Sequence, residues 1–313
     1  MMRKPHGTIW SAPFRMQHET GVLLDAQNDR RLIDAYTKPP IHGWALHKLR
    51  EAGIVSTEQL SWLYPRLVAW VKSWYEYMDW DHDGMCQYNH GNDSGWDNCT
   101  YFKIGAPIEG PELAAYLTLC HMELSDMAKT LGDPEAAAKH EQDAHNQLQQ
   151  LIDTCWTGER FRVLQSGSHR EMQNCDSLLA YLPVILGDLL PKNIFDALAA
   201  GIVQDDRFLT PYGVATESVS SQYYIPDGYW MGPIWAPSTM FIIDGLNRGG
   251  RKDLAVQIAR AFCDNCAVNG FAENFDAQTG AGLRDRAYTW TSSVFMTLVR
   301  TLLSENESLV PLI

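Results

Sequence analysis

The feature that most constrains the fold is the recurrence of apolar residues at intervals of three and four positions. After Thr57 the apolar positions are Leu60, Leu63, Leu67, Val71, Trp74 and Met78. Residues so spaced lie on one face of an α-helix, and a second such face runs from Leu113 to Leu131. Gly132-Asp133-Pro134 then predicts the end of one helix, a cap and the first turn of the next, which continues to about Trp156.

Helical patterns extend over most of the chain. Further helices are predicted near 18–35, 42–52, 174–187, 191–203, 237–248, 251–268 and 288–303. Strand signals are few, and residues 157–160 predict the turn of one small hairpin. Long loops rich in Gly, Pro, Asn and Asp occupy 79–111, 204–236 and 269–287, and long loops in a compact domain are usually functional. This alternation predicts an all-α toroid whose loops gather at one mouth.

The composition is that of a soluble globular protein. Hydrophobic residues make up 45% and charged residues 20%, enough to build a sizeable core. The chain shows neither a fixed-period repeat nor a composition break. Residues 1–313 are therefore predicted to form one α/α-barrel domain, with 1–37 as an irregular N-terminal segment packed on the barrel.

The net charge and the cysteine content limit which binding partners and which cellular compartment we expect. The net charge is −13 and Lys and Arg do not cluster, which argues against nucleic-acid binding. The sequence has neither a secretory leader nor a run long enough to span a membrane, and its seven scattered cysteines suit reduced thiols. We therefore expect a cytoplasmic protein that binds neither nucleic acid nor membrane.

Sequence motifs give little support for a metal or cofactor site. Asp79 to Gly84 matches the opening of an EF-hand loop, but position 12 is His90 where a bidentate Glu is required, so only weak calcium binding in 79–90 stays open. Cys263 and Cys266 form a lone CxxC near a helix end and are interpreted as buried thiols. His140 and His145 fall on different faces of one helix. We predict no cofactor and no metal.

Two loop carboxylates remain as candidates for chemistry. Asp97 follows Trp96, and Glu273 lies between Phe271 and Phe275. An apolar setting raises the pKa of a carboxyl group, which suits general acid or base catalysis. Glycoside hydrolysis needs two such groups facing each other, and aromatic rings also stack on sugars. Spacing alone favours the simpler interpretation, in which Asp97 caps a turn and Glu273 is a solvated loop residue.

Five motifs, in order, resemble glycoside hydrolase family 63, which is related to trehalases and debranching-type glucosidases. They are the helix start from Lys38 to Ala45, Ser94-Gly95-Trp96-Asp97-Asn98, the stretch from Tyr229 to Trp235, Glu273-Asn274-Phe275-Asp276 with Thr279-Gly280, and Trp290-Thr291-Ser292-Ser293. The similarity extends from about Lys38 to Leu303. Each motif alone is weak, whereas five in register are fairly specific.

The resemblance implies an (α/α)6 toroid of the six-hairpin glycosidase type and an inverting glycosidase mechanism. It assigns Asp97 as general acid and Glu273 as general base, about 6.5–9.5 Å apart with a water between them. The substrate would be a small saccharide or glycoside with an α-glucosidic or α-mannosidic bond. The implied substrate-binding residues are Lys38, Trp44, Gly95, Trp96, Asn98, Trp230, Gly232, Trp235, Asn274 and Trp290.

Several positions depart from the family pattern. Lys38 stands where Gln is common, Asp93 where Glu is frequent, Cys99 for Ser, and Met231 for an Arg that would supply a bidentate donor. Only nine or ten helices are expected rather than twelve, which predicts a barrel incomplete at its N-terminal side. Self-association or a partner would then cover the open side. Two alternatives stay open: a barrel remnant that binds carbohydrate without turnover, and a sugar epimerase of the same fold class.

Overall fold

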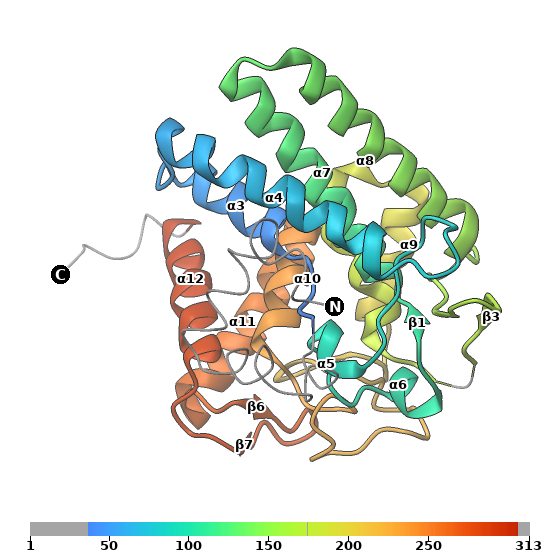
Figure 1. Ribbon diagram of the computed structural model, residues 1–313. Coiled ribbons are helices and arrows are strands. Elements are labelled where there is room, and N and C mark those ends of the chain that lie inside the picture. The colour runs from blue at the N-terminus through green and yellow to red at the C-terminus, as the bar shows by residue number, and fades with distance from the viewer. Residues whose placement is uncertain (1–36, 174, 306–313) are drawn as a thin grey trace, which may run out of the picture. The chain divides into compact units, whose positions relative to one another are not determined.

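The computed structural model describes residues 37–173 and 175–305 (Figure 1). Its longer helices follow the apolar spacing closely, and the helix expected at 18–35 lies outside the described residues. Short helices α5 and α6 were not predicted. The helices are α3 (His42–Glu51), α4 (Thr57–Tyr77), α5 (Gly91–Ser94), α6 (Thr100–Ile104), α7 (Pro111–Leu131), α8 (Pro134–Cys155), η3 (Leu178–Leu189), α9 (Lys192–Val203), α10 (Ala236–Arg248), α11 (Lys252–Asn269) and α12 (Thr289–Glu305).

One predicted helix takes a different form. The stretch expected at 174–187 is a 3-10 helix, η3, that begins at Leu178 after the cap residue Ser177. Pro183 lies inside it and lacks the N–H that an α-helix would use, while Gly187 has a φ of 57° that breaks the helical path. Proline within a helix does not always have this effect, since α4 continues through Pro65.

The strands are short and lie in the loops between the helices. They are β1 (Ile108–Glu109), β2 (Leu164–Gln165), β3 (Arg170–Glu171), β4 (Leu209–Thr210), β5 (Gly213–Val214), β6 (Asn274–Phe275) and β7 (Gly282–Leu283). β4 pairs antiparallel with β5, and β6 with β7, where Asn274 faces Leu283 and Phe275 faces Gly282. The predicted small hairpin is confirmed by an antiparallel bridge between Trp156 and Phe161.

The chain divides into two compact units, and the single domain expected for 1–313 stays a prediction. Of the described residues, unit 1 comprises 37–97, 106–154 and 165–169, and unit 2 comprises 98–105, 155–164, 170–173 and 175–305. The segment expected to pack on the barrel, 1–37, lies outside the described residues except for its last residue. Among the described residues, no helix is both long and apolar enough to cross a bilayer.

Unit 1 is built on α7, against which α3 and α4 pack (Figure 1). A Cβ at Gly43 would lie 2.4 Å from the Cα of Cys120, so glycine is what allows α3 to approach α7 this closely. The predicted junction between α7 and α8 is confirmed: Gly132 adopts a left-handed conformation, and Asp133 accepts a hydrogen bond from Ala136 N at 3.0 Å. The loop that follows α4 therefore starts from a helix that packs on α7.

Unit 2 is built on α10, which packs against η3, α11 and α12. A Cβ at Gly245 of α10 would lie 2.1 Å from the carbonyl oxygen of Val184 in η3, so the backbones of α10 and η3 are in direct contact. Phe262 of α11 meets Phe275 of β6 edge to face, with ring centroids 6.2 Å apart. This contact attaches the β6–β7 hairpin, and with it Glu273, to the helical core.

Candidate active site

The loop after α4 in unit 1 is held by the buried Asp93. Its carboxylate accepts three backbone hydrogen bonds, from Thr37 N at 2.9 Å, Asn89 N at 3.1 Å and His90 N at 3.0 Å. Burial raises the pKa of Asp93, while these donors act in the opposite direction. Asp93 thus fixes the start of the one-turn helix α5.

α5 in turn sets the backbone position of Asp97. The Ser94 hydroxyl donates to the carbonyl of Gly91 at 2.8 Å and accepts from Trp96 N at 3.0 Å. A Cβ at Gly91 would lie only 1.9 Å from the backbone oxygen of Asp97, so the loop folds tightly on itself at that point. The Trp96 ring is buried, whereas Asp97 is partly exposed at the end of this turn.

Two of the remaining predicted binding residues of unit 1, Lys38 and Gly95, belong to or contact this loop. Lys38 is exposed, and its Nζ donates to the carbonyl of Asn92 at 3.0 Å. Gly95 has a φ of 76°, and a Cβ there would lie 3.7 Å from Cγ of Pro39. Trp44 is a partly exposed residue of α3. Lys38 and Gly95 therefore belong to the same loop assembly as Asp97.

In unit 2, Asn98 fastens the aromatic segment from Gly228 to Trp235. Its side-chain amide donates to the carbonyl of Gly228 at 3.0 Å and accepts from Trp230 N at 3.0 Å. Gly232 N donates to the Thr216 hydroxyl at 3.2 Å, and a Cβ at Gly232 would lie 2.5 Å from the Ile225 oxygen. Asn98 and Gly232 thus shape the backbone that carries the tryptophans.

The predicted tryptophans of unit 2 differ in exposure. Trp230 and Trp235 stack with ring centroids 4.1 Å apart and an interplanar angle of 6°, and both are buried. Trp290 lies 6.3 Å from Trp235 and is 48% exposed. Trp235 therefore supports its neighbours, while Trp290 has a face available to a ligand.

Glu273 lies directly before β6 and is partly buried. The Tyr229 hydroxyl donates to Glu273 Oε1 at 3.1 Å, and Glu273 N donates to the Asp285 carbonyl at 2.7 Å. The next residue, Asn274, is fully buried and its Oδ1 accepts from Arg284 Nη1 at 3.3 Å. Both the backbone and the carboxylate of Glu273 are thus held in place.

Sequence reasoning assigned no role to Arg284 and none to Tyr229 beyond its place in a motif. The Arg284 guanidinium lies 4.9 Å from the centroid of the Tyr229 ring and pairs with Asp227 at 2.5 Å. Both Tyr229, with a φ of 65°, and Arg284, with a φ of 60°, adopt left-handed backbone conformations that non-glycine residues rarely take. Such strain clusters at functional sites. A sequence gives no direct signal of such backbone strain at residues other than glycine.

Asp97 belongs to unit 1 and Glu273 to unit 2, so their opposition across a substrate stays a prediction. What the structure brings together is local: Asp97 with Gly91, Ser94 and Trp96, and Glu273 with Tyr229. In sequence, Asp97 and Asn98 are adjacent, and Asn98 holds the segment that carries Tyr229.

The other motifs singled out in the sequence behave as packing or turn elements. Asp79 Oδ2 accepts from Gly84 N at 3.1 Å, and Asp83 Oδ1 from Met85 N at 2.7 Å, as expected for a turn rich in Asp side-chain contacts. Cys263 and Cys266 are buried in α11, and burial raises their pKa values to about 11 and about 12. Their burial agrees with the interpretation of both cysteines as buried thiols of a helix.

Comparison with known proteins identifies the family. A family model described as "Mannosylglycerate hydrolase MGH1-like glycoside hydrolase domain" matches residues 6–291. A mannosylglycerate hydrolase of Rubrobacter radiotolerans is 28% identical over 190 residues, which cover 58% of this chain and 42% of that protein. The chain therefore aligns with less than half the length of this curated relative.

Solved structures agree on the fold. The GH63 mannosylglycerate hydrolase from Thermus thermophilus in complex with glucose has a TM-score of 0.73 at 18% identity, covering 84% of this chain and 75% of that one. An uncharacterised conserved protein of the same organism has a TM-score of 0.74 at 17% identity, covering 84% and 77%. The predicted all-α, (α/α)6 toroid class is confirmed by these neighbours. The chain belongs to the mannosylglycerate hydrolase MGH1-like glycoside hydrolase family.

Proposed function

We propose that this chain is an inverting glycoside hydrolase that cleaves an α-glucosidic or α-mannosidic bond in a small saccharide or glycoside. The family match over residues 6–291 supports glycoside hydrolysis as the reaction class and includes both candidate carboxylates. The observation that carries the assignment within this chain is the setting of Glu273, held by the Tyr229 hydroxyl in a strained aromatic loop.

Mannosylglycerate is the first substrate to test. The curated relative from Rubrobacter radiotolerans and the structural neighbour from Thermus thermophilus both carry the name mannosylglycerate hydrolase. Met231 stands where the family resemblance leads one to expect an arginine, and its side chain is buried. The loss of a bidentate donor at that point favours a substrate contact that differs from the family pattern.

Asp97 is assigned as the general acid. Inversion is a single displacement, in which Asp97 would donate its proton to the glycosidic oxygen as the bond to the anomeric carbon breaks. General acid catalysis requires the carboxyl group to hold one position relative to that oxygen. The contacts among Gly91, Ser94 and Trp96 supply this fixed backbone.

Glu273 is assigned as the general base. It would accept a proton from the water that attacks the anomeric carbon from the opposite face, so that an α-linked substrate releases the β-anomer. The Tyr229 hydroxyl bonds Oε1, so we assign Oε2 as the oxygen that takes the proton. After one turnover, water has supplied a hydroxyl group to the sugar and a proton to the leaving group, through Asp97 and Glu273.

The test is proton NMR of the purified chain with mannosylglycerate and a panel of α-glucosides and α-mannosides. We expect the β-anomer to appear first, and Asp97→Asn and Glu273→Gln each to abolish its release. Asp264→Asn on α11 and Glu159→Gln in the small hairpin change the same side-chain types at exposed positions and should leave the rate unchanged.

Other outcomes would overturn the proposal in distinct ways. Release of the α-anomer would contradict inversion but keep hydrolysis. Conversion of a free sugar without hydrolysis would favour an epimerase. Carbohydrate binding without any turnover, by a folded protein, would favour a barrel remnant that has kept its ligand but lost its chemistry.

A further inference from the structure

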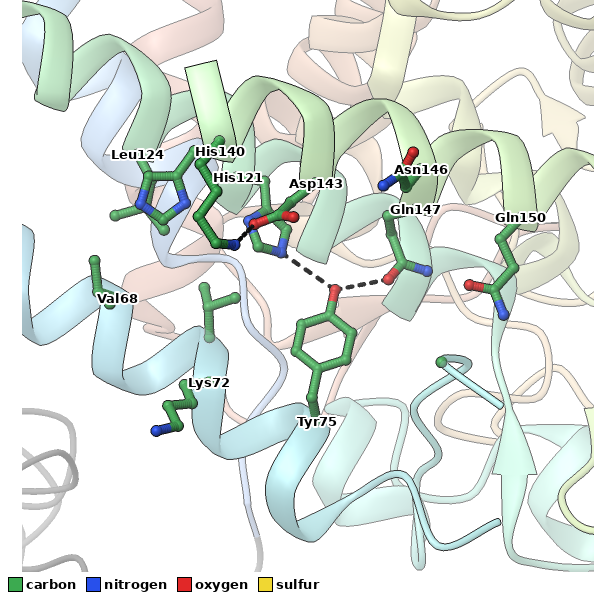
Figure 2. Close-up of a pocket in the computed structure, with 13 residues that line it drawn as sticks. Val68, Lys72, Tyr75, His121, Leu124, His140, Asp143, Asn146, Gln147 and Gln150 are labelled. Atoms are coloured by element: carbon green, nitrogen blue, oxygen red, sulfur yellow. Dashed lines mark hydrogen bonds and ion pairs between the residues drawn. The ribbon is translucent and has the colours of Figure 1, made fainter. Parts of the chain in front are cut away.

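A pocket of about 600 Å³ lies within unit 1, between α4, α7 and α8 (Figure 2). It contains none of the residues assigned to glycoside hydrolysis. Tyr75 of α4, His121 of α7 and His140 of α8 line it, and the amide side chains Asn146, Gln147 and Gln150 continue along α8. The two histidines and Asp143 gather at one end of this row (Figure 2).

These three residues form a potential ligand set. One ligand atom from each of His121, His140 and Asp143 lies within 4.8 Å of the others. The two imidazole rings have centroids 5.9 Å apart and an interplanar angle of 35°. Two imidazoles and a carboxylate are a donor set that suits zinc and similar transition metals. Ligand atoms of a tetrahedral zinc ion lie roughly 3.3 Å apart, so small side-chain movements would close the set.

The hydrogen bonds of Tyr75 determine which nitrogen of His121 is free. The Tyr75 hydroxyl donates its single proton to Gln147 Oε1 at 2.6 Å. Its oxygen must then accept from His121 Nε2, 3.3 Å away. In a neutral ring the other nitrogen, Nδ1, carries a lone pair, and this atom is buried with no hydrogen-bond partner. His121 is only 7% exposed. A buried lone pair without a donor is costly, and a bound cation would satisfy it.

The contacts of His140 and Asp143 also suit metal binding. His140 Nε2 bonds the Tyr64 hydroxyl at 3.1 Å, while its Nδ1 is also buried and unpartnered. A bond from the second ring nitrogen to an outer partner is what metal-binding histidines usually have. Asp143 pairs with Lys139 at 2.5 Å, and Lys139 is 71% exposed, so this lysine can swing into solvent. Burial lowers the pKa of His121 to about 4 and also lowers that of His140.

We propose that His121, His140 and Asp143 bind one divalent transition-metal ion of the zinc type, which joins α7 to α8. The free Nδ1 atoms of the two histidines and one oxygen of Asp143 are the protein ligands. Three protein ligands leave a coordination position open toward the pocket, where water or a small anion would complete the site.

Isothermal titration calorimetry of the metal-stripped full chain with Zn²⁺ tests the proposal, alongside absorption spectra with Co²⁺. We expect one strong site and, for Co²⁺, the intense visible bands of tetrahedral coordination. His121→Ala, His140→Ala and Asp143→Asn should each weaken Zn²⁺ binding at least tenfold. His145→Ala, at an exposed position of the same helix, should not change it. Tyr75→Phe keeps all three ligands but removes an outer hydrogen bond, and should weaken binding by about 10–100-fold.

Two results would overturn the proposal. One is a parent chain that binds neither Zn²⁺ nor Co²⁺. The other is strong binding that survives in His140→Ala and Asp143→Asn, whose partly exposed positions make misfolding less of a concern than at His121. Binding that is lost only in His169→Ala would assign the metal to the exposed cluster with Asp81 and Asp83 instead. Circular dichroism confirms that each variant is folded.

Discussion

Replacing Gly91 with alanine tests how the loop from His90 to Asn98 positions the proposed acid. A Cβ at Gly91 would lie 1.9 Å from the backbone oxygen of Asp97, and real Cβ contacts are essentially never shorter than 3.0 Å. The difference requires a displacement of about 1.1 Å. Misplacement of a catalytic group by about 1 Å can cost about 100-fold in rate, or roughly 2.7 kcal/mol. We therefore expect kcat of Gly91→Ala to fall about 100-fold.

The assay is steady-state kinetics on the substrate that the NMR panel identifies. Because Asp97 acts in bond cleavage, kcat should fall much more than KM rises. Gly105→Ala is the matched control: its φ of 170° suits any residue, and its Cβ would meet nothing closer than Met172 Cε at 3.9 Å. A folded Gly91→Ala protein with kcat within about threefold of the parent would refute the proposed dependence of Asp97 on this close approach.

Three further perturbations have expected outcomes. Tyr229→Phe removes a hydrogen bond to a charged group, about 1.5–3 kcal/mol, so kcat should fall about 10- to 100-fold with the fold intact by circular dichroism. Asn98→Ala removes both bonds to the 228–230 segment and should lower the free energy of unfolding by about 1–3 kcal/mol in urea titrations, and kcat as well. Burial raises the pKa of Glu112 from 4.5 to about 8, so the folded state holds this proton longer than the unfolded state. Stability should therefore fall by about 3 kcal/mol as the pH rises from 4.5 to 7. Glu112→Gln should remove that slope, and an unchanged slope would contradict the assignment.

The sequence predicted the helices well because their signals are local. Apolar spacing marks the buried face of a helix, and Gly132-Asp133-Pro134 gave the junction of α7 and α8 to the residue. The departure at η3 has a local cause too, since Pro183 and Gly187 lie within it. The two-unit division was not visible, because it depends on which helices pack together rather than on any break in composition.

The site was predicted only where a motif is continuous in sequence. The stretch from Ser94 to Asn98 identified the loop of Asp97, but the role of Gly91 follows from a backbone contact that no spacing rule contains. Tyr229 and Arg284 meet because two loops fold together, and their left-handed conformations are imposed by that packing. Tertiary contacts of this kind leave no periodic trace in a sequence.

The histidines illustrate the same limit, because the metal site proposed above could not be inferred from their positions in the sequence. Sequence reasoning paired His140 with His145 on one helix and set metal binding aside because the two point to different faces. The structure pairs His140 with His121 of the neighbouring helix, and Asp143 completes the group. Helical periodicity assigns each residue to a face but does not say which other helix that face meets. A donor set divided between two helices is therefore invisible until the packing of α7 on α8 is known, and a metal ion bound there would stabilise that same packing.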